Sequence, residues 1–243
     1  MGMHKWFAVV LGSIGFFGSA KAGLTSIQSP PHGEANQAQI LSHVYGGSFV
    51  ADGNNFSNGS LKALRLDDSG ADSTYAGDQY FVRAIAKFTD LDESFGYTGG
   101  PFAQSYRKLL DVGGSGFNTS GSAQNFSGKG DIVWNLSGGN SSIYSTKRSD
   151  NPNQQDAAVT YKLTGASDNL VRYVQFWENL NADHPSKKTR NDYNDLVVEI
   201  TVEGSNAGAG GANTVPLPAS IWTGSALMTA LLLWRGRRLL RIA

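Results

Sequence analysis

The sequence predicts an all-β domain, a β-sandwich of the jelly-roll kind, between an N-terminal signal peptide and a C-terminal transmembrane sorting helix. Three observations support this prediction. Each end holds an apolar run beside basic residues; glycine, serine, asparagine and aspartate divide the middle into short segments; and apolar residues in those segments alternate with a period of two. Short alternating strands joined by glycine-rich turns are typical of sandwiches, with a closed barrel as the alternative.

Residues 1–22 have the organisation of a secretory signal peptide. Lys5 precedes an apolar run at residues 6–17, and Ala20 and Ala22 supply the small side chains of a signal peptidase site. We therefore expect signal peptidase to cleave after Ala22 and the chain to be exported. An uncleaved anchor helix is the alternative, although the run is short for a membrane span.

Residues 23–203 are expected to form one β-sandwich domain. The clearest alternation predicts strands at residues 61–66, 80–88, 131–136, 157–163, 170–177 and 196–202. In the last of these, Leu196 and Val198 belong to a face expected to be buried, and Glu199 to a face expected to be solvated. In the second, alternate residues from Tyr80 to Phe88 are expected to face inward, opposed by Arg83 and Lys87.

Two stretches rich in glycine are expected to lack regular structure. Residues 113–130 are expected to form a long loop. Residues 204–214 hold no large apolar side chain and are expected to be a flexible linker.

Residues 215–243 carry a second apolar run, at 219–234, followed by Arg235, Arg237 and Arg238. As a helix this run spans about 24 Å, close to the ~30 Å of a bilayer core. The arginines favour the cytoplasmic side, so the preceding domain lies on the exported side. The run has no polar stripe, which disfavours the alternative of an amphipathic helix packed on the domain.

The formal net charge of zero conceals an acidic exported part. All 20 acidic residues lie between Glu34 and Glu203, whereas two of the 20 basic residues lie in the signal peptide and four in the tail, which leaves a net charge of −6. This balance argues against nucleic acid as a partner. Cysteine is absent, so an exported domain depends on its core, on bound metal, or on both.

The segment NDYNDLVVEI, residues 191–200, places amides and carboxylates at the start of a strand. If the alternation continued backwards, Asp192 and Asn194 would face the buried side, where an unpartnered carboxylate is costly. A hairpin between the last two predicted strands would bring Glu178 close to Asp192 and Asp195. Ca²⁺ takes six to eight oxygen ligands, so we predict a structural calcium site formed by Glu178, Asp192, Asn194 and Asp195.

Two alternatives to calcium remain open at this position. The side chains would cap backbone amides in an Asx-turn cluster, or Lys187, Lys188 and Arg190 would neutralise the carboxylates. An EF-hand is excluded, because His184 and Arg190 occupy the positions that require glycine and glutamate.

The sequence predicts that the protein is not an enzyme. It lacks the G-x-S-x-G, H-E-x-x-H and phosphate-loop motifs, and its histidines are scattered. Carboxylates at Asp67 and Asp68 leave a glycoside hydrolase as a weaker alternative, but solvated turn residues explain them more simply. The aromatic residues Trp134, Trp177 and Tyr97 are expected in the core, with sugar stacking as the alternative.

The tail resembles a known sorting signal. Residues Val215, Pro216, Leu217, Pro218 and Ala219, followed by an apolar helix and arginines, are similar to the VPLPA variant of the PEP-CTERM signal. The resemblance implies recognition around the two prolines by a membrane exosortase in a Gram-negative bacterium, often one that makes exopolysaccharide and biofilm. Leu217 stands where the commoner form has glutamate, which leaves the type of exosortase open.

Residues 131–200 also resemble an uncharacterised exported β-domain that recurs in PEP-CTERM proteins. The matching stretches are IVWNLSGG, AAVTYKLTG, VQFWENL and NDYNDLVVEI, together with FGYTGG at residues 95–100. Related domains carry W-E-D and D-x-D-Y-N-D motifs and are thought to bind calcium. Asn179 replaces the aspartate of W-E-D here, which implies weaker calcium affinity.

These observations together predict an exported structural protein of the cell surface or extracellular matrix. Its expected partners are signal peptidase, an exosortase and, before processing, the inner membrane. The alternative is a carbohydrate-binding module for the cell's own exopolysaccharide.

Overall fold

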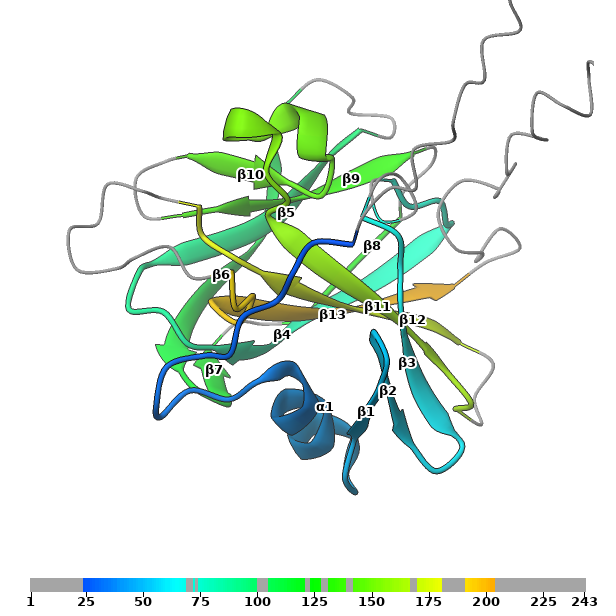
Figure 1. Cartoon of the computed structure of the whole chain (residues 1–243). Helices are drawn as coiled ribbons and strands as arrows, with labels where there is room; N and C mark the ends of the chain where they lie inside the picture. The colour runs from blue at the N-terminus through cyan, green and yellow to red at the C-terminus, as the bar shows by residue number, and fades with distance from the viewer. Residues whose placement is uncertain are drawn as a thin grey trace, which may run out of the picture.

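The chain forms a β-sandwich of two antiparallel sheets, which confirms the predicted all-β sandwich and shows two open sheets instead of a closed barrel (Figure 1). The computed structural model describes residues 24–68, 72, 74–99, 105–120, 123–127, 131–138, 142–166, 170–180 and 191–203. The predicted signal peptide, linker and sorting helix lie outside these residues. Within them, no helix is long and apolar enough to span a bilayer.

The larger sheet has eight strands. Their order across the sheet is β1 (Val50–Asp52), β2 (Asn55–Asn58), β3 (Leu61–Arg65), β11 (Ala158–Thr164), β12 (Val171–Trp177), β13 (Leu196–Glu203), β4 (Gln79–Lys87) and β8 (Gln124–Ser127). The smaller sheet has five strands. Their order is β10 (Ile143–Ser145), β9 (Ile132–Ser137), β5 (Glu93–Gly99), β6 (Arg107–Ser115) and β7 (Asn118–Ser120). A helix, α1 (Gln37–Tyr45), and two 3₁₀ turns, η2 (Arg148–Asp150) and η3 (Pro152–Gln154), complete the described elements.

All six predicted strands are present, each within one residue of its predicted ends, as β3, β4, β9, β11, β12 and β13. The predicted long loop at residues 113–130 is wrong, because this stretch contains the end of β6 and the whole of β7 and β8. β7 and β8 each lie at the edge of a sheet. Edge strands pair on one side only and bury little, so their sequences lack a clear apolar alternation.

Aromatic side chains fill the space between the sheets. Trp134 on β9 is fully buried, with its ring centroid 5.4 Å from that of Phe95 and 5.6 Å from that of Tyr80. Trp177 and Tyr97 belong to the same cluster. All three aromatic residues singled out in the sequence are thus core residues, as expected, and none of them offers a platform for sugar.

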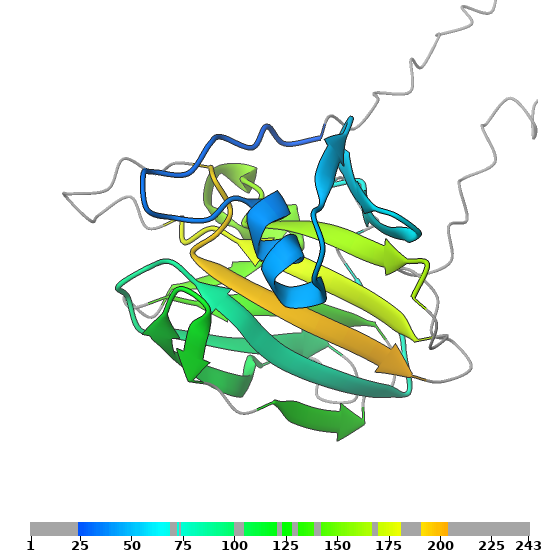
Figure 2. The ribbon, with the colours of Figure 1, turned by 90° about the horizontal axis from the view of Figure 1, so that it is seen from below.

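A second apolar cluster lies on the outer face of the larger sheet. Helix α1 crosses this face (Figure 2) and contributes Ile40 and Leu41, which cluster with Phe176 and Val197 of the sheet. The prediction of a solvated face on the last strand is therefore wrong: Glu199 is only 3% exposed. The helix begins at a capping box, in which the Asn36 side chain accepts from the Gln39 N–H and the Gln39 side chain accepts from the Asn36 N–H, both at 2.9 Å.

A bulge interrupts the pairing of β4 with β13. Val197 pairs with Ala86 and Val198 with Ala84, so Ile85 is the extra residue. The expected inward row along β4 therefore ends at Ala84, and Lys87 is buried instead of solvated. Its Nζ donates to the carbonyl oxygens of Thr89 at 2.8 Å and Gly114 at 3.5 Å, which offsets part of the cost of burying the ammonium group.

Candidate functional site

The structure brings the predicted carboxylates together at one end of the larger sheet. Strands β12 and β13 are antiparallel with Trp177 opposite Leu196, so Glu178 follows the end of one strand where Asp195 precedes the start of the other. The Asn179 N–H donates to Asp195 Oδ2 at 2.8 Å. We call the group formed by Glu178, Asp192 and Asp195 the strand-mouth cluster.

The backbone turns before β13, so the strand alternation does not extend back to Asp192. Residues 191–192 form a turn and Tyr193 has a φ of 53°, in the left-handed region that bulky residues avoid. Two hydrogen bonds hold Tyr193 in this conformation: its N–H donates to Glu178 Oε2 at 3.0 Å, and its hydroxyl donates to the Asp156 carbonyl oxygen at 3.1 Å.

Asn194 points away from the expected direction as a consequence of this turn. Its Nδ2 donates to the Ala35 carbonyl oxygen and to Glu34 Oε2, each at 3.2 Å, which places the amide against the segment before α1. Its Oδ1 is buried and has no hydrogen-bond partner among the described atoms. Asn194 thus lies beside the strand-mouth cluster but is anchored to a different segment.

Burial and mutual repulsion govern the electrostatics of the strand-mouth cluster. Glu178, Asp192 and Asp195 are 4%, 5% and 9% exposed. Burial raises the pKa of Glu178 to about 10, and the carboxylates of Asp195 and Asp192 add to this effect, while the Tyr193 N–H opposes it. Without a bound cation, Glu178 therefore keeps its proton at neutral pH.

The strand-mouth cluster supplies the hard oxygen ligands that Ca²⁺ prefers. Within the described part of the chain, no group of three or more His, Cys, Asp or Glu side chains is arranged to hold a metal as it stands. Binding a cation would therefore require the three carboxylates to move closer together as Glu178 loses its proton. Lys187, Lys188 and Arg190, the competing neutralising residues, lie outside the described ranges.

A second carboxylate group was missed by the sequence analysis. Asp68 and Asp72 are each 2% exposed, so the interpretation of Asp68 as a solvated turn residue is wrong, whereas Asp67 is exposed. Arg65 NH2 lies 2.8 Å from Asp68 Oδ2. Burial raises the pKa of Asp72 well above its usual value, and the negative charges of Asp68 and Asp156 raise it further.

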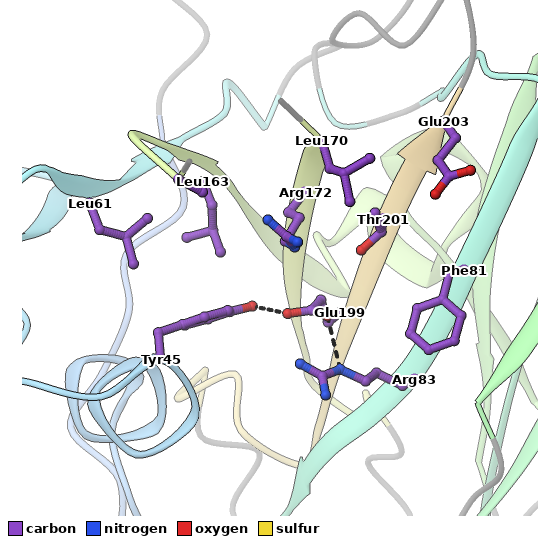
Figure 3. Close-up of a pocket in the computed structure, with 11 residues that line it drawn as sticks. Tyr45, Leu61, Phe81, Arg83, Leu163, Leu170, Arg172, Glu199, Thr201 and Glu203 are labelled. Atoms are coloured by element: carbon purple, nitrogen blue, oxygen red, sulfur yellow. Dashed lines mark hydrogen bonds and ion pairs between the residues drawn. The ribbon is translucent and has the colours of Figure 1, made fainter. Parts of the chain in front are cut away.

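A groove of about 460 Å³ lies on the outer face of the larger sheet, beside α1 (Figure 3). Its apolar walls include Leu61, Leu163, Leu170 and Phe81. At one end Arg83 Nε donates to Glu199 Oε1 at 2.9 Å, and the Tyr45 hydroxyl donates to Glu199 Oε2. Burial and the neighbouring Glu199 carboxylate raise the pKa of Tyr45 well above its usual range, so this hydroxyl stays protonated.

No sequence pattern predicted the groove, because its residues come from α1 and from several strands that are distant in sequence. The one signal was Glu199 itself, an acidic residue between Val198 and Ile200 in the middle of the last strand.

Comparison with known proteins identifies weak structural similarity only. No protein-family model matches the chain, and no curated protein matches it. Among solved structures, the high-affinity mannose-binding lectin of Ralstonia solanacearum aligns with 61% of this chain and 99% of its own, at 14% identity and a TM-score of 0.34. The C-terminal domain of the BC2L-C lectin from Burkholderia cenocepacia aligns with 58% of this chain and 99% of its own, at 13% identity and a TM-score of 0.33.

Proposed function

We propose that the protein is an exported structural component of the cell surface or extracellular matrix of a Gram-negative bacterium. We also propose that it binds a structural calcium ion at the end of the sandwich where β12 ends and β13 begins. The observation that supports the calcium site is the position of Glu178. Its carboxyl group is buried beside Asp192 and Asp195, and burial, together with the negative charges of these two aspartates, raises its pKa to about 10. A divalent cation is the alternative to a proton at such a position.

In this proposal Glu178, Asp192 and Asp195 are the charged ligands, and the buried Oδ1 of Asn194 is a neutral one. The ion would join the end of β12 to the turn before β13, and so tie the last strand of the domain to its neighbour. Its role is structural: it stabilises the fold and performs no chemistry.

Calcium is expected to stabilise the protein against thermal unfolding. At a free Ca²⁺ concentration of a hundred times the dissociation constant, the gain is about 2.7 kcal/mol, because the ligand binds only the folded state. This corresponds to a rise in Tm of several degrees, measured by calorimetry in calcium and in EGTA. Because Glu178 must release its proton, binding is expected to tighten as the pH rises.

Two variants test whether calcium binds at the strand-mouth cluster. Asp192→Asn is expected to abolish the calcium-dependent shift in Tm, whereas Asp67→Asn, at an exposed position, is expected to leave it unchanged. An equal calcium-dependent rise in Tm in both variants would mean that calcium binds at another site. No rise in Tm at millimolar Ca²⁺ in the unmodified protein would contradict the proposed calcium site altogether.

The two ends of the sequence support export and sorting. We expect a Pro216→Ala/Pro218→Ala variant, expressed in a host with an exosortase, to keep its C-terminal segment and to stay in the membrane fraction. Mass spectrometry of the intact chain and cell fractionation measure this result. Pro152→Ala, in η3, is the control. Normal processing of the double variant would contradict recognition of residues 215–219 by an exosortase.

Carbohydrate binding is the second candidate, and the groove beside α1 favours it. Apolar walls, an aromatic ring and charged side chains line one concavity, as in sites for small ligands. A carbohydrate-binding domain binds oligosaccharide saturably, whereas a purely structural domain does not, and titration with a defined oligosaccharide distinguishes the two.

A further inference from the structure

Three buried aspartates lie close together where the described chain begins. Asp68, Asp72 and Asp156 are 2%, 2% and 8% exposed. Burial raises the pKa of Asp72, and the nearby negative charges of Asp68 and Asp156 raise it further. Thr25 joins two members of this group: its N–H donates to Asp68 Oδ2 and its hydroxyl donates to Asp156 Oδ2. We call Asp68, Asp72 and Asp156 the N-terminal cluster, because they hold the start of the described chain.

The N-terminal cluster holds more negative than positive charge among the described residues. The buried Arg65 lies with NH2 2.8 Å from Asp68 Oδ2, and the exposed Arg148 lies with NH1 3.9 Å from Asp156 Oδ2. Neither arginine forms an ion pair with Asp72 within the described part of the chain. Asp72 Oδ1 and Asp68 Oδ1 are buried, and neither has a hydrogen-bond partner among the described atoms. Buried carboxylate oxygens of this kind are unfavourable until a cation or a proton compensates them.

The position of Thr25 indicates which cation can reach these oxygens. The expected cleavage after Ala22 makes Gly23 the first residue of the exported chain, two positions before Thr25. Two residues span at most about 7 Å, so the new α-amino group is confined close to the N-terminal cluster. An ammonium group carries three donors and a compact charge, so it can serve two carboxylates at once. A group tethered at such a short distance needs little intrinsic affinity to stay bound.

We propose that the N-terminal cluster is a binding site for an ammonium group, and that the α-amino group of Gly23 occupies it after signal peptidase has cleaved the chain. Hydrolysis of the bond between Ala22 and Gly23 adds one water, which leaves a carboxylate on Ala22 and a protonated amino group on Gly23. This amino group pairs with Asp72 and with the second oxygen of Asp68. The inference rests on the proposed export and adds a consequence of it: the domain reaches its full stability only as the processed chain.

The test compares two chains, purified in detergent, that differ only at the N-terminus. One comprises residues 23–243 and begins at Gly23 after exact removal of a fusion partner. The other carries two added glycines before Gly23, which keep the charge but move it by up to about 7 Å. The chain that begins at Gly23 is expected to have a Tm about 5 °C higher, measured by calorimetry in EDTA. Asp72→Asn is expected to abolish this difference, whereas Asp131→Asn, at an exposed position, is expected to retain it.

The reactivity of the α-amino group is a second measurement, which a purely structural role of Asp72 would not change. Cyanate carbamoylates only the unprotonated amine, and neighbouring carboxylates favour the protonated form. At pH 7 the rate at Gly23, followed by mass spectrometry, is expected to be about tenfold lower than the rate at the first glycine of the extended chain. Asp72→Asn is expected to restore the faster rate. The comparison of the two N-termini needs no substitution in the cluster, so it stands even if Asp72→Asn does not fold.

The outcomes separate this inference from the export on which it rests. Equal Tm values or equal carbamoylation rates in the two chains would overturn the inference and leave export in place. A calcium-dependent rise in Tm that Asp72→Asn abolishes would assign the N-terminal cluster to a metal ion and overturn the ammonium site. An exported chain whose first residue, by mass spectrometry, is not Gly23 would also overturn the inference, whereas a chain that keeps its signal peptide would count against export itself.

Discussion

Raising the pH from 5 to 8 without divalent cations is expected to destabilise the folded protein, by up to about 1.4 kcal/mol per pH unit for each buried carboxyl group concerned. The pKa of Glu178 is about 10 in the folded state and near 4.5 in the unfolded state. Between these values the folded state holds a proton that the unfolded state has lost. The contribution of Glu178 to the free energy of unfolding is therefore largest below its unfolded pKa and falls as the pH rises towards its folded pKa.

Glu178→Gln isolates the contribution of this one carboxyl group. Glutamine resembles the protonated acid in shape and cannot ionise, so the slope of stability against pH is expected to fall by the amount that one proton contributes. Part of the slope remains, because Asp72 and Asp156 have pKa values raised in the same direction, chiefly by burial. Urea unfolding in EDTA, at a series of pH values, measures the slope.

The same variant links the pH dependence to calcium. Calcium is expected to flatten the slope in the unmodified protein, because it replaces the proton on Glu178, and to have no such effect in Glu178→Gln. Glu203→Gln, at the exposed end of β13, is the control and keeps the full slope. A slope unchanged by Glu178→Gln would show that Glu178 titrates normally and would undermine the strand-mouth cluster as a cation site.

Sequence alternation predicted the strands that bury one full face. Strong apolar rows run along β9, β12, β13 and the first half of β4. The ends of these four strands were predicted to within one residue. Helix α1 was missed because it has only nine residues and two buried aliphatic side chains, too few for a clear helical period. The signal that identifies it is the capping box from Asn36 to Gln39.

The candidate site was predictable to the extent that strand pairing determines it. Glu178 and Asp195 meet because β12 and β13 pair along their full length. The direction of Asn194 was not predictable, since it depends on a left-handed backbone at Tyr193, a residue type that seldom adopts it. The burial of Asp68 depends on Thr25, Arg65 and Asp156, which converge only in the folded chain.

Replacing Arg65 by methionine is expected to lower the free energy of unfolding by about 3–5 kcal/mol, because it leaves a buried carboxylate without its cation. The Arg65 side chain is 5% exposed and that of Asp68 is 0% exposed, with 2.8 Å between NH2 and Oδ2. The same NH2 group donates to the carbonyl oxygen of Thr25 at 2.7 Å. Methionine fills similar space, so the loss measures the uncompensated carboxylate and not a cavity.

Lys108→Met is the matched control, because it also removes a cation from an ion pair with an aspartate three residues away. Lys108 Nζ lies 2.8 Å from Asp111 Oδ2, but the two side chains are 54% and 72% exposed. An exposed pair contributes about 0–1 kcal/mol, so urea unfolding is expected to show little change. A loss in Arg65→Met no larger than in the control would mean that Asp68 finds another cation.

The Arg65–Asp68 ion pair also holds the segment that begins the described chain, because Arg65 NH2 donates to the Thr25 carbonyl oxygen. Asp68 also accepts the Thr25 N–H, and Thr25 Oγ1 donates to Asp156, so the same residues fix the start of the described chain to the sandwich. The arginine thus stabilises both a buried carboxylate group and the attachment of the N-terminal segment, and faster proteolysis near Thr25 is the expected sign that the two are lost together.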